Sequence, residues 1–242
     1  MHQASVGYHC PECVAGQGQQ VYTARNLMNQ RPPVTTALIV ANVVAFVFQL
    51  GTDGALTRWG LLFGPAIEFG EWWRIITGGF LHASILHIGF NMYALWIFGP
   101  TLEKGVGAVR FLLIYLAGLF GSSLAVLLFD YSQSTLGASG AVLGLAGGLA
   151  AVLMTRGINL FQTSLGAIFL INLALPILVP RISFWGHAGG IVGGFLAALA
   201  LSWLPERAGV ATRTATAVAA LLVVGFFAAA LFVGQNSALA FG

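Results

Sequence analysis

Seven apolar segments, each close to the length of a membrane-spanning helix, dominate the sequence. A helix needs about 20 apolar residues to cross a hydrocarbon layer, and lipid admits only structures that satisfy their own backbone polar groups. Charged residues are only 7% of the chain, against about 25% in a typical soluble domain. The sequence therefore predicts an all-α, polytopic membrane helix bundle. The expected spans are Thr35–Leu50, Ser84–Pro100, Val109–Phe129, Ser139–Thr155, Asn159–Val179, Phe184–Leu204 and Thr214–Val233.

The positions of the basic residues predict the orientation of this bundle. Lysine and arginine near span ends stay in the cytoplasm, and seven of the ten lie in the tail or follow an even-numbered span. We therefore expect a multi-pass protein of a bacterial plasma membrane with a cytoplasmic N-terminus. The basic residues are scattered and form no stripe, so nucleic acid is not an expected partner. The lipid bilayer is an expected partner.

Three polar residues, His87, Ser139 and His187, lie near the start of the second, fourth and sixth spans. Even-numbered spans run inward from the outer face, so all three residues belong to the outer leaflet. A polar side chain at membrane depth is costly without partners and is a functional candidate by default. This shared depth predicts one polar site that opens to the extracytoplasmic side.

Glycine repeats predict which helices meet at that site. The fourth span carries glycine at 140, 144 and 148, and the sixth carries it at 186, 190 and 194. Four-residue spacing lines up small residues on one face, which lets two membrane helices approach closely. Close packing of these faces would bring the Ser139 hydroxyl near the His187 imidazole. Such repeats also occur in plain helix packing, where the serine would be only a packing residue.

These residue types suit acyl transfer. Serine becomes a nucleophile when a neighbouring base takes its proton, and histidine can do this near neutral pH. All seven carboxylates lie outside the predicted spans, so a Ser139–His187 dyad is expected. His87 and Asn91 share a helix face and could donate to an oxyanion with the Ser139 N–H. A metal site at His82 and His87 is the competing reading, which their five-residue spacing disfavours.

Taken together, these residues resemble a rhomboid intramembrane serine protease over about residues 35 to 204. The matching positions are Trp73, Arg74, Thr77, Phe80, His82, Ser84, His87, Asn91, Gly137, Ala138, Ser139, Gly140, His187, Gly190 and Gly194. The resemblance implies a six-helix core, and the last span resembles the seventh helix that many members carry.

The resemblance also implies roles for residues. Ser139 would be the nucleophile, His187 the general base and acid, and His87 and Asn91 oxyanion-hole donors with Ser139. Gly137, Gly140, Gly190, Gly194, Trp73 and Arg74 would give structural support, while Glu103 and Arg110 resemble a structural polar pair. One departure is Leu143, where the family usually has an aromatic residue that packs on the catalytic histidine.

The implied function is serine endopeptidase activity on transmembrane protein substrates. Two other classes stay open: a catalytically inactive rhomboid-like protein that binds membrane proteins, and a small-solute transporter. A transporter would be expected to show internal repeats and charged sites near the midplane, which the sequence lacks.

We expect three regions in the chain. Residues 1–34 form a polar cytoplasmic tail, 35–204 the catalytic core, and 205–242 a linker, the seventh span and a short tail. No cofactor is expected for the core. Cys10 and Cys13 form a CxxC pair, which is half of a zinc site that His2, His9 or a second chain would have to complete. An exposed dithiol is the other reading.

Overall fold

In the computed structural model, the described residues are 2–3, 8–9, 32–163, 166–167, 169–171, 174 and 182–241. Contacts divide the chain into two units, Met1–Arg31 and Pro32–Gly242. In the first unit, β1 (His2–Gln3) pairs antiparallel with β2 (Tyr8–His9), with His2 opposite His9. Cys10 and Cys13 lie outside the described residues, so the zinc reading stays a prediction.

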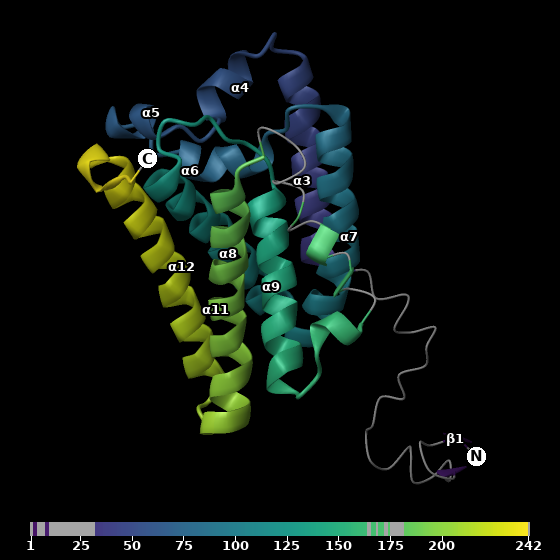
Figure 1. The fold of residues 1–242 in the computed structure, drawn as a ribbon. Helices are drawn as coiled ribbons and strands as arrows, with labels where there is room; N and C mark the ends of the chain where they lie inside the picture. Colours follow the sequence, from purple (N-terminus) through teal and green to yellow (C-terminus); the bar gives the residue numbers. More distant parts are fainter. Residues whose placement is uncertain are drawn as a thin grey trace. The chain divides into compact units, whose positions relative to one another are not determined.

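The second unit is a helix bundle, which confirms the all-α fold class (Figure 1). Among the described residues, five helices are long and apolar enough to cross a membrane, and a shorter apolar helix joins them. The five are α3 (Pro33–Leu50), α7 (Ile85–Val106), α8 (Ala108–Phe129), α11 (Phe184–Ala208) and α12 (Thr212–Gly234), and the shorter one is α9 (Ser139–Thr155). The chain is thus a multi-pass membrane protein.

Two helices extend past the predicted ends of their spans. α7 continues through Pro100 to Val106, and α11 continues through Pro205 to Ala208. A proline inside a membrane helix is tolerated when other groups satisfy the backbone that it frees. The added turns carry Lys104 and Arg207, so each helix extends beyond its apolar stretch.

The first residues of the fifth predicted span, up to residue 163, form no α-helix. They include the short 3₁₀ helix η2 (Leu160–Gln162), and Asn159 caps that turn by accepting a hydrogen bond from the Phe161 N–H. Most of Asn159–Val179 lies outside the described residues. Of the positions that are described, 166–167, 169–171 and 174 are helical.

The connection from α3 to α7 is a folded loop. It contains α4 (Ala55–Gly60), α5 (Gly64–Glu68), α6 (Arg74–Thr77) and η1 (Gly78–Phe80). Ile67 and Ile75 of this loop are fully buried, so the loop packs onto the bundle. A last short helix, η3 (Ser237–Leu239), follows α12.

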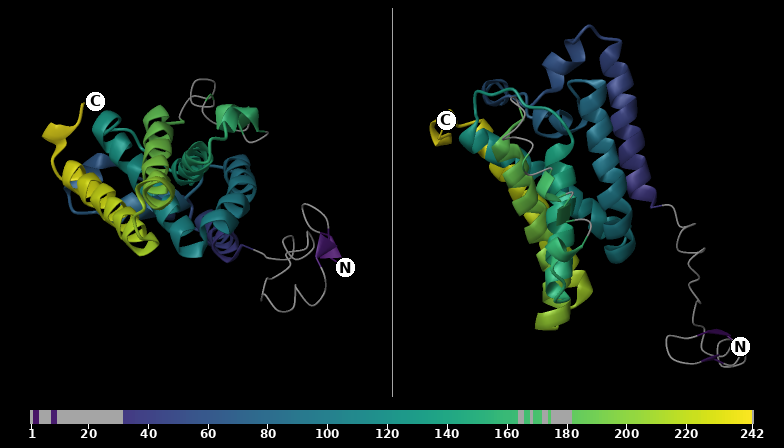
Figure 2. Two further views of the ribbon diagram at one scale, coloured as in Figure 1. Left: turned by 90° about the horizontal axis from the view of Figure 1, so that it is seen from below. Right: turned by 45° about the vertical axis from the view of Figure 1, so that its right-hand side comes forward.

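The helices α9 and α11 lie side by side (Figures 1 and 2). Close glycine contacts join them, as the repeats predicted. A Cβ added to Gly194 would meet the Cα of Gly144 at 2.6 Å, and one on Gly144 would meet the Gly190 oxygen at 3.0 Å. α8 is a third partner that the sequence reading missed. A Cβ on Gly121 of α8 would meet the Gly189 oxygen at 2.7 Å.

Candidate functional site

The segment before Ser139 is held by backbone pairing with the loop between α3 and α7. Leu62 and Thr135 exchange two N–H to carbonyl hydrogen bonds of 2.9 Å, and the Gly137 N–H donates to the Gly78 carbonyl at 2.9 Å. These bonds join residues far apart in the sequence. They fix the chain immediately before the first turn of α9, which begins at Ser139.

Both the His87 ring and the Ser139 hydroxyl lie close to Gly137. Its φ of +131° lies in the region that side chains rarely adopt. An added Cβ would lie 2.8 Å from Cε1 and Nε2 of His87 and 3.8 Å from the Ser139 Oγ. Both side chains therefore lie within 4 Å of one point, and Gly137 leaves room for the imidazole beside the hydroxyl.

His187 lies on α11 next to the same site. It is buried, at 4% exposed, in the first turn of the helix. A Cβ on Gly140 would meet the Gly186 oxygen at 3.3 Å, and one on Gly190 would meet the Gly140 carbonyl carbon at 2.7 Å. Because Ser139 precedes Gly140 and His187 follows Gly186, this backbone contact brings the two predicted dyad residues to the same level of the bundle.

The hydrogen bonds of His87 indicate which ring nitrogen carries the proton. Its Nδ1 accepts a long hydrogen bond of 3.3 Å from the Ala83 N–H. In a neutral imidazole, one nitrogen accepts while the other donates, so the proton belongs on Nε2, the nitrogen nearest Gly137. Asn91 is 5% exposed, and its Nδ2 donates to the His87 carbonyl at 3.0 Å. One of the two amide hydrogens is used there.

The His82 ring packs against the His87 ring. His82 is 1% exposed, and its ring meets the His87 ring edge to face, with centroids 5.2 Å apart. Burial, and next the neighbouring His87, lowers the pKa of His82 to about 4, so the ring is neutral. Gln49 of α3 makes two hydrogen bonds with the His82 backbone: its Nε2 donates to the carbonyl, and its Oε1 accepts from the N–H. Gln49 was missed by the sequence reading, although it is polar at the end of an apolar span.

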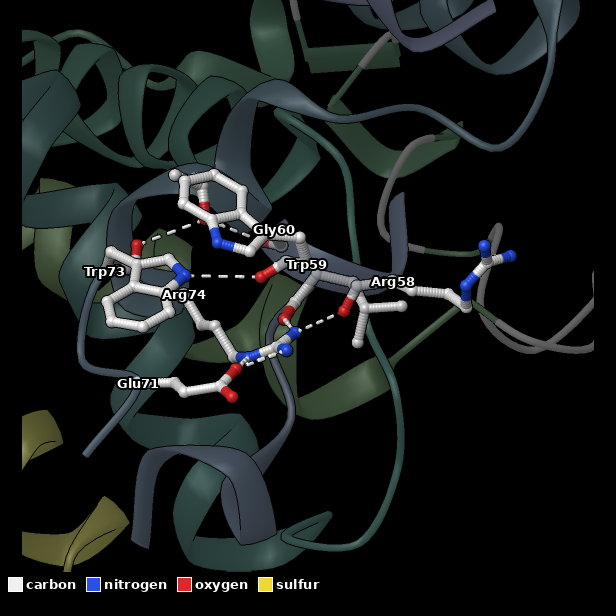
Figure 3. Close-up of polar contacts among 8 residues, drawn as sticks. Arg58, Trp59, Gly60, Glu71, Trp73 and Arg74 are labelled. Atoms are coloured by element: carbon white, nitrogen blue, oxygen red, sulfur yellow. Dashed lines mark hydrogen bonds and ion pairs between the residues drawn. The ribbon is translucent and has the colours of Figure 1, made fainter. Parts of the chain in front are cut away.

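Trp73 and Arg74 have structural contacts within the loop between α3 and α7 (Figure 3). Arg74 is 7% exposed, and its Nη1 donates to the carbonyls of Arg58 and Leu61 at 2.8 and 2.9 Å. The Trp73 indole N–H donates to the Trp59 carbonyl, and the two rings stack at 5.6 Å. The Arg74 bonds hold Leu61, the residue before the Leu62–Thr135 pairing.

The two positions that resemble a polar pair have separate contacts. The Glu103 carboxylate accepts from the N–H groups of Val34 and Thr35 and from the Thr35 hydroxyl. It therefore caps the first turn of α3, where backbone N–H groups lack intrahelical partners. Arg110 instead reaches Thr216 of α12 at 3.4 Å.

Two further predicted features concern Leu143 and metal ions. Leu143 is 2% exposed, one turn after Ser139 on α9, so this aliphatic side chain is buried in the bundle. Within the part of the chain that the structure describes, no three His, Cys, Asp or Glu residues group as they would around a metal ion.

The fold and the clustered polar residues define an all-helical, multi-pass membrane protein with one polar site at the N-terminal ends of α7, α9 and α11. The Rhomboid domain family model matches residues 69–204, which is more than half of the chain. The chain belongs to the rhomboid family.

Three relatives show how far the similarity extends. The chain is 36% identical over 234 residues to the rhomboid protease GluP of Bacillus subtilis (strain 168), covering 93% of this chain and 45% of GluP. It is 31% identical over 172 residues to the putative rhomboid protease YdcA of the same organism, covering 68% and 86%. It is 38% identical over 146 residues to RHOMBOID-like protein 6, mitochondrial, of Arabidopsis thaliana, covering 58% and 47%. The chain thus spans less than half the length of GluP and of the Arabidopsis protein.

Proposed function

We propose that this chain is an intramembrane serine endopeptidase, which hydrolyses peptide bonds in or next to transmembrane segments of membrane proteins. The observation that carries the proposal is that the His87 ring and the Ser139 hydroxyl both lie within 4 Å of the position that a Cβ on Gly137 would occupy. The α9–α11 contact next to it, which brings His187 to the same level, supports a serine–histidine dyad. The names of GluP and YdcA support a protease.

In the proposed first half-reaction, Ser139 Oγ attacks the carbonyl carbon of the scissile peptide bond while His187 takes the hydroxyl proton. The tetrahedral intermediate then collapses, the C–N bond breaks, and His187 returns the proton to the leaving amine. The product is an ester between Ser139 and the acyl part of the substrate. In the second half-reaction, water activated by His187 hydrolyses this ester and restores the serine.

Three donors are proposed for the oxyanion of the tetrahedral intermediate. His87 would donate from Nε2, since its Nδ1 is occupied as an acceptor. Asn91 would donate the amide hydrogen that is not used by the His87 carbonyl. The backbone N–H of Ser139 belongs to the first turn of α9, where such groups lack intrahelical partners. A donor of this kind typically contributes about 3 kcal/mol to transition-state binding.

The proposed substrates are transmembrane proteins that reach the site from the bilayer. A peptide bond inside a helix has its carbonyl engaged, so the substrate segment must unwind before Ser139 can attack. We place the site at the extracytoplasmic end of the bundle, because Lys104 and Arg207 lie at the far ends of α7 and α11 and basic residues favour the cytoplasm.

Detection of covalent labelling at Ser139 tests the proposal directly. Purified protein in detergent is incubated with a fluorophosphonate probe, and the labelled peptide is identified by mass spectrometry. Cleavage of a model transmembrane substrate is measured in parallel. We expect wild type to be labelled and active, and Ser139→Ala and His187→Ala to lose both properties while keeping their helical content.

Ser134→Ala is the matched control, because Ser134 is an exposed serine in the segment that leads to α9. It should keep full labelling and cleavage. If folded wild-type protein cleaves no substrate and Ser139 takes no label, the peptidase proposal is wrong and the rhomboid-like binding protein becomes the better reading. Full cleavage by Ser139→Ala would exclude Ser139 as the nucleophile.

A further inference from the structure

The first turn of α11, which carries His187, is capped by Ser183. The Ser183 Oγ accepts a hydrogen bond from the Gly186 N–H at 3.1 Å, and the Ser183 carbonyl accepts from the His187 N–H at 3.2 Å. Serine is a preferred residue at this position because it satisfies a backbone N–H that the helix leaves unpaired. The cap therefore sets the path of the backbone at His187 itself.

The same hydroxyl also forms a hydrogen bond at the C-terminal end of α8. The Ser183 O–H donates to Oδ2 of Asp130 at 2.8 Å. Asp130 ends α8, where its N–H donates to the Val126 carbonyl, and its own carbonyl accepts from the Gln133 N–H. A hydrogen bond to a carboxylate is stronger than one between neutral groups. It also orients the hydroxyl, so that a lone pair of Oγ points at the Gly186 N–H.

A stacking contact joins the same two segments. The rings of Phe129, which precedes Asp130, and Trp185, which follows the capping serine by two residues, stack with centroids 4.2 Å apart and planes 24° apart. The C-terminal end of α8 is thus joined to the first turn of α11 at two adjacent points, one polar and one aromatic.

This attachment adds side-chain contacts at the end of a helix whose closest approach to α9 is made by glycines. Gly190 and Gly194 of α11 lie against glycine backbone on α9, and these two positions carry no side chain that would resist rotation. With side chains, a helix has a radius of about 5–6 Å, so a 10° rotation would move an imidazole by about 1 Å. A misplacement of about 1 Å can cost about 100-fold in rate.

We propose that Asp130 is a positioning residue for His187, acting through the Ser183 cap to fix the rotation of α11. This inference rests on the proposed peptidase function and deepens it. Asp130 orients the imidazole indirectly, by holding the helix that carries His187.

The test measures kcat and KM for cleavage of a model transmembrane substrate, together with the rate of fluorophosphonate labelling at Ser139. Asp130→Ala and Ser183→Ala should each lower kcat about 10- to 100-fold and leave KM within about twofold. The double variant should be no slower than the slower single variant, because both changes break one connection. Asp130→Asn and Ser183→Thr keep the acceptor and the hydroxyl and should remain within about threefold of wild type.

Ser237→Ala is the matched control. The Ser237 hydroxyl donates to Glu68 at 2.9 Å. This is also a serine–carboxylate bond, but it is exposed and does not involve α11. It should leave kcat unchanged. Thermal unfolding in detergent identifies variants that fail to fold. If the alanine variants fail to fold, the conservative variants Asp130→Asn and Ser183→Thr test the role instead, and a large kcat loss in both contradicts it.

Three outcomes overturn the positioning role. One is wild-type kcat in both alanine variants, and another is a loss confined to KM. In both cases the wild-type protein is still labelled at Ser139, so the peptidase function stands. The third is a wild type that neither cleaves nor takes label, which removes the peptidase function and this role together.

Discussion

Gly194 of α11 and Gly144 of α9 are in backbone contact, and a Cβ on Gly194 would meet the Gly144 Cα at 2.6 Å. Gly194→Ala should therefore destabilise the protein by about 1–3 kcal/mol, as overpacked interfaces do. Gly225→Ala in α12 is the control, since nothing lies within 4 Å of its added Cβ; alanine favours the helix there. Unfolding titrations in mixed micelles measure both. Equal stabilities of the two variants would contradict the close contact.

A methyl group at Gly137 should abolish activity while the bundle stays folded. The added Cβ would lie 2.8 Å from the His87 ring, and the backbone φ of +131° is itself unfavourable for alanine. We expect Gly137→Ala to lower kcat/KM for substrate cleavage at least about 100-fold, because the ring must shift away from the oxyanion position.

Gly70→Ala separates the two causes of that loss. Gly70 also has a positive φ, of +96°, but nothing lies within 4 Å of its added Cβ. It should show backbone strain of about 1–3 kcal/mol in unfolding measurements and keep cleavage within about threefold. A comparable loss of cleavage in both variants would assign the effect to strain and remove the His87 contact from the explanation.

Sequence patterns predicted the parts of this fold that repeat at short range. The bounds of α9 and its contact with α11 followed from apolar length and from glycines four residues apart. A second repeat on the sixth span, Gly189 and Gly193, was equally visible, and it is the face that α8 covers. The prediction used only the repeat at 186, 190 and 194, which lies on the face toward α9.

Tertiary pairs could not be predicted because no local pattern encodes them. The Leu62–Thr135 pairing, the Gln49 contacts with His82 and the Asp130–Ser183 bond each join residues more than 30 positions apart. The partner of Glu103 could likewise not be predicted, because the N-terminus of α3, which Glu103 caps, precedes it by nearly 70 residues. The catalytic roles of Ser139 and His187 stay predictions.

Loss of the Glu103 carboxylate should destabilise the bundle more than loss of an exposed carboxylate. Glu103 is 4% exposed and accepts three hydrogen bonds at the start of α3. Glu103→Ala leaves two backbone N–H groups without this partner, at a cost of about 2–4 kcal/mol. Glu206→Ala should change stability by less than about 0.5 kcal/mol, because Glu206 is half-exposed and 3.9 Å from Arg156. Equal effects in unfolding titrations would contradict the capping role.

The buried His82 ring should make stability depend on pH below neutrality. Its folded pKa of about 4 lies below the ordinary value of 6.5, so between these values the unfolded state binds more protons. Stability therefore falls as the pH falls through this window, by about 3 kcal/mol in total. His82→Gln removes the titrating group, and unfolding free energies of both proteins at pH 7, 6, 5 and 4.5 should converge as the pH is lowered. Parallel pH profiles would show that His82 is already protonated or does not titrate in this range.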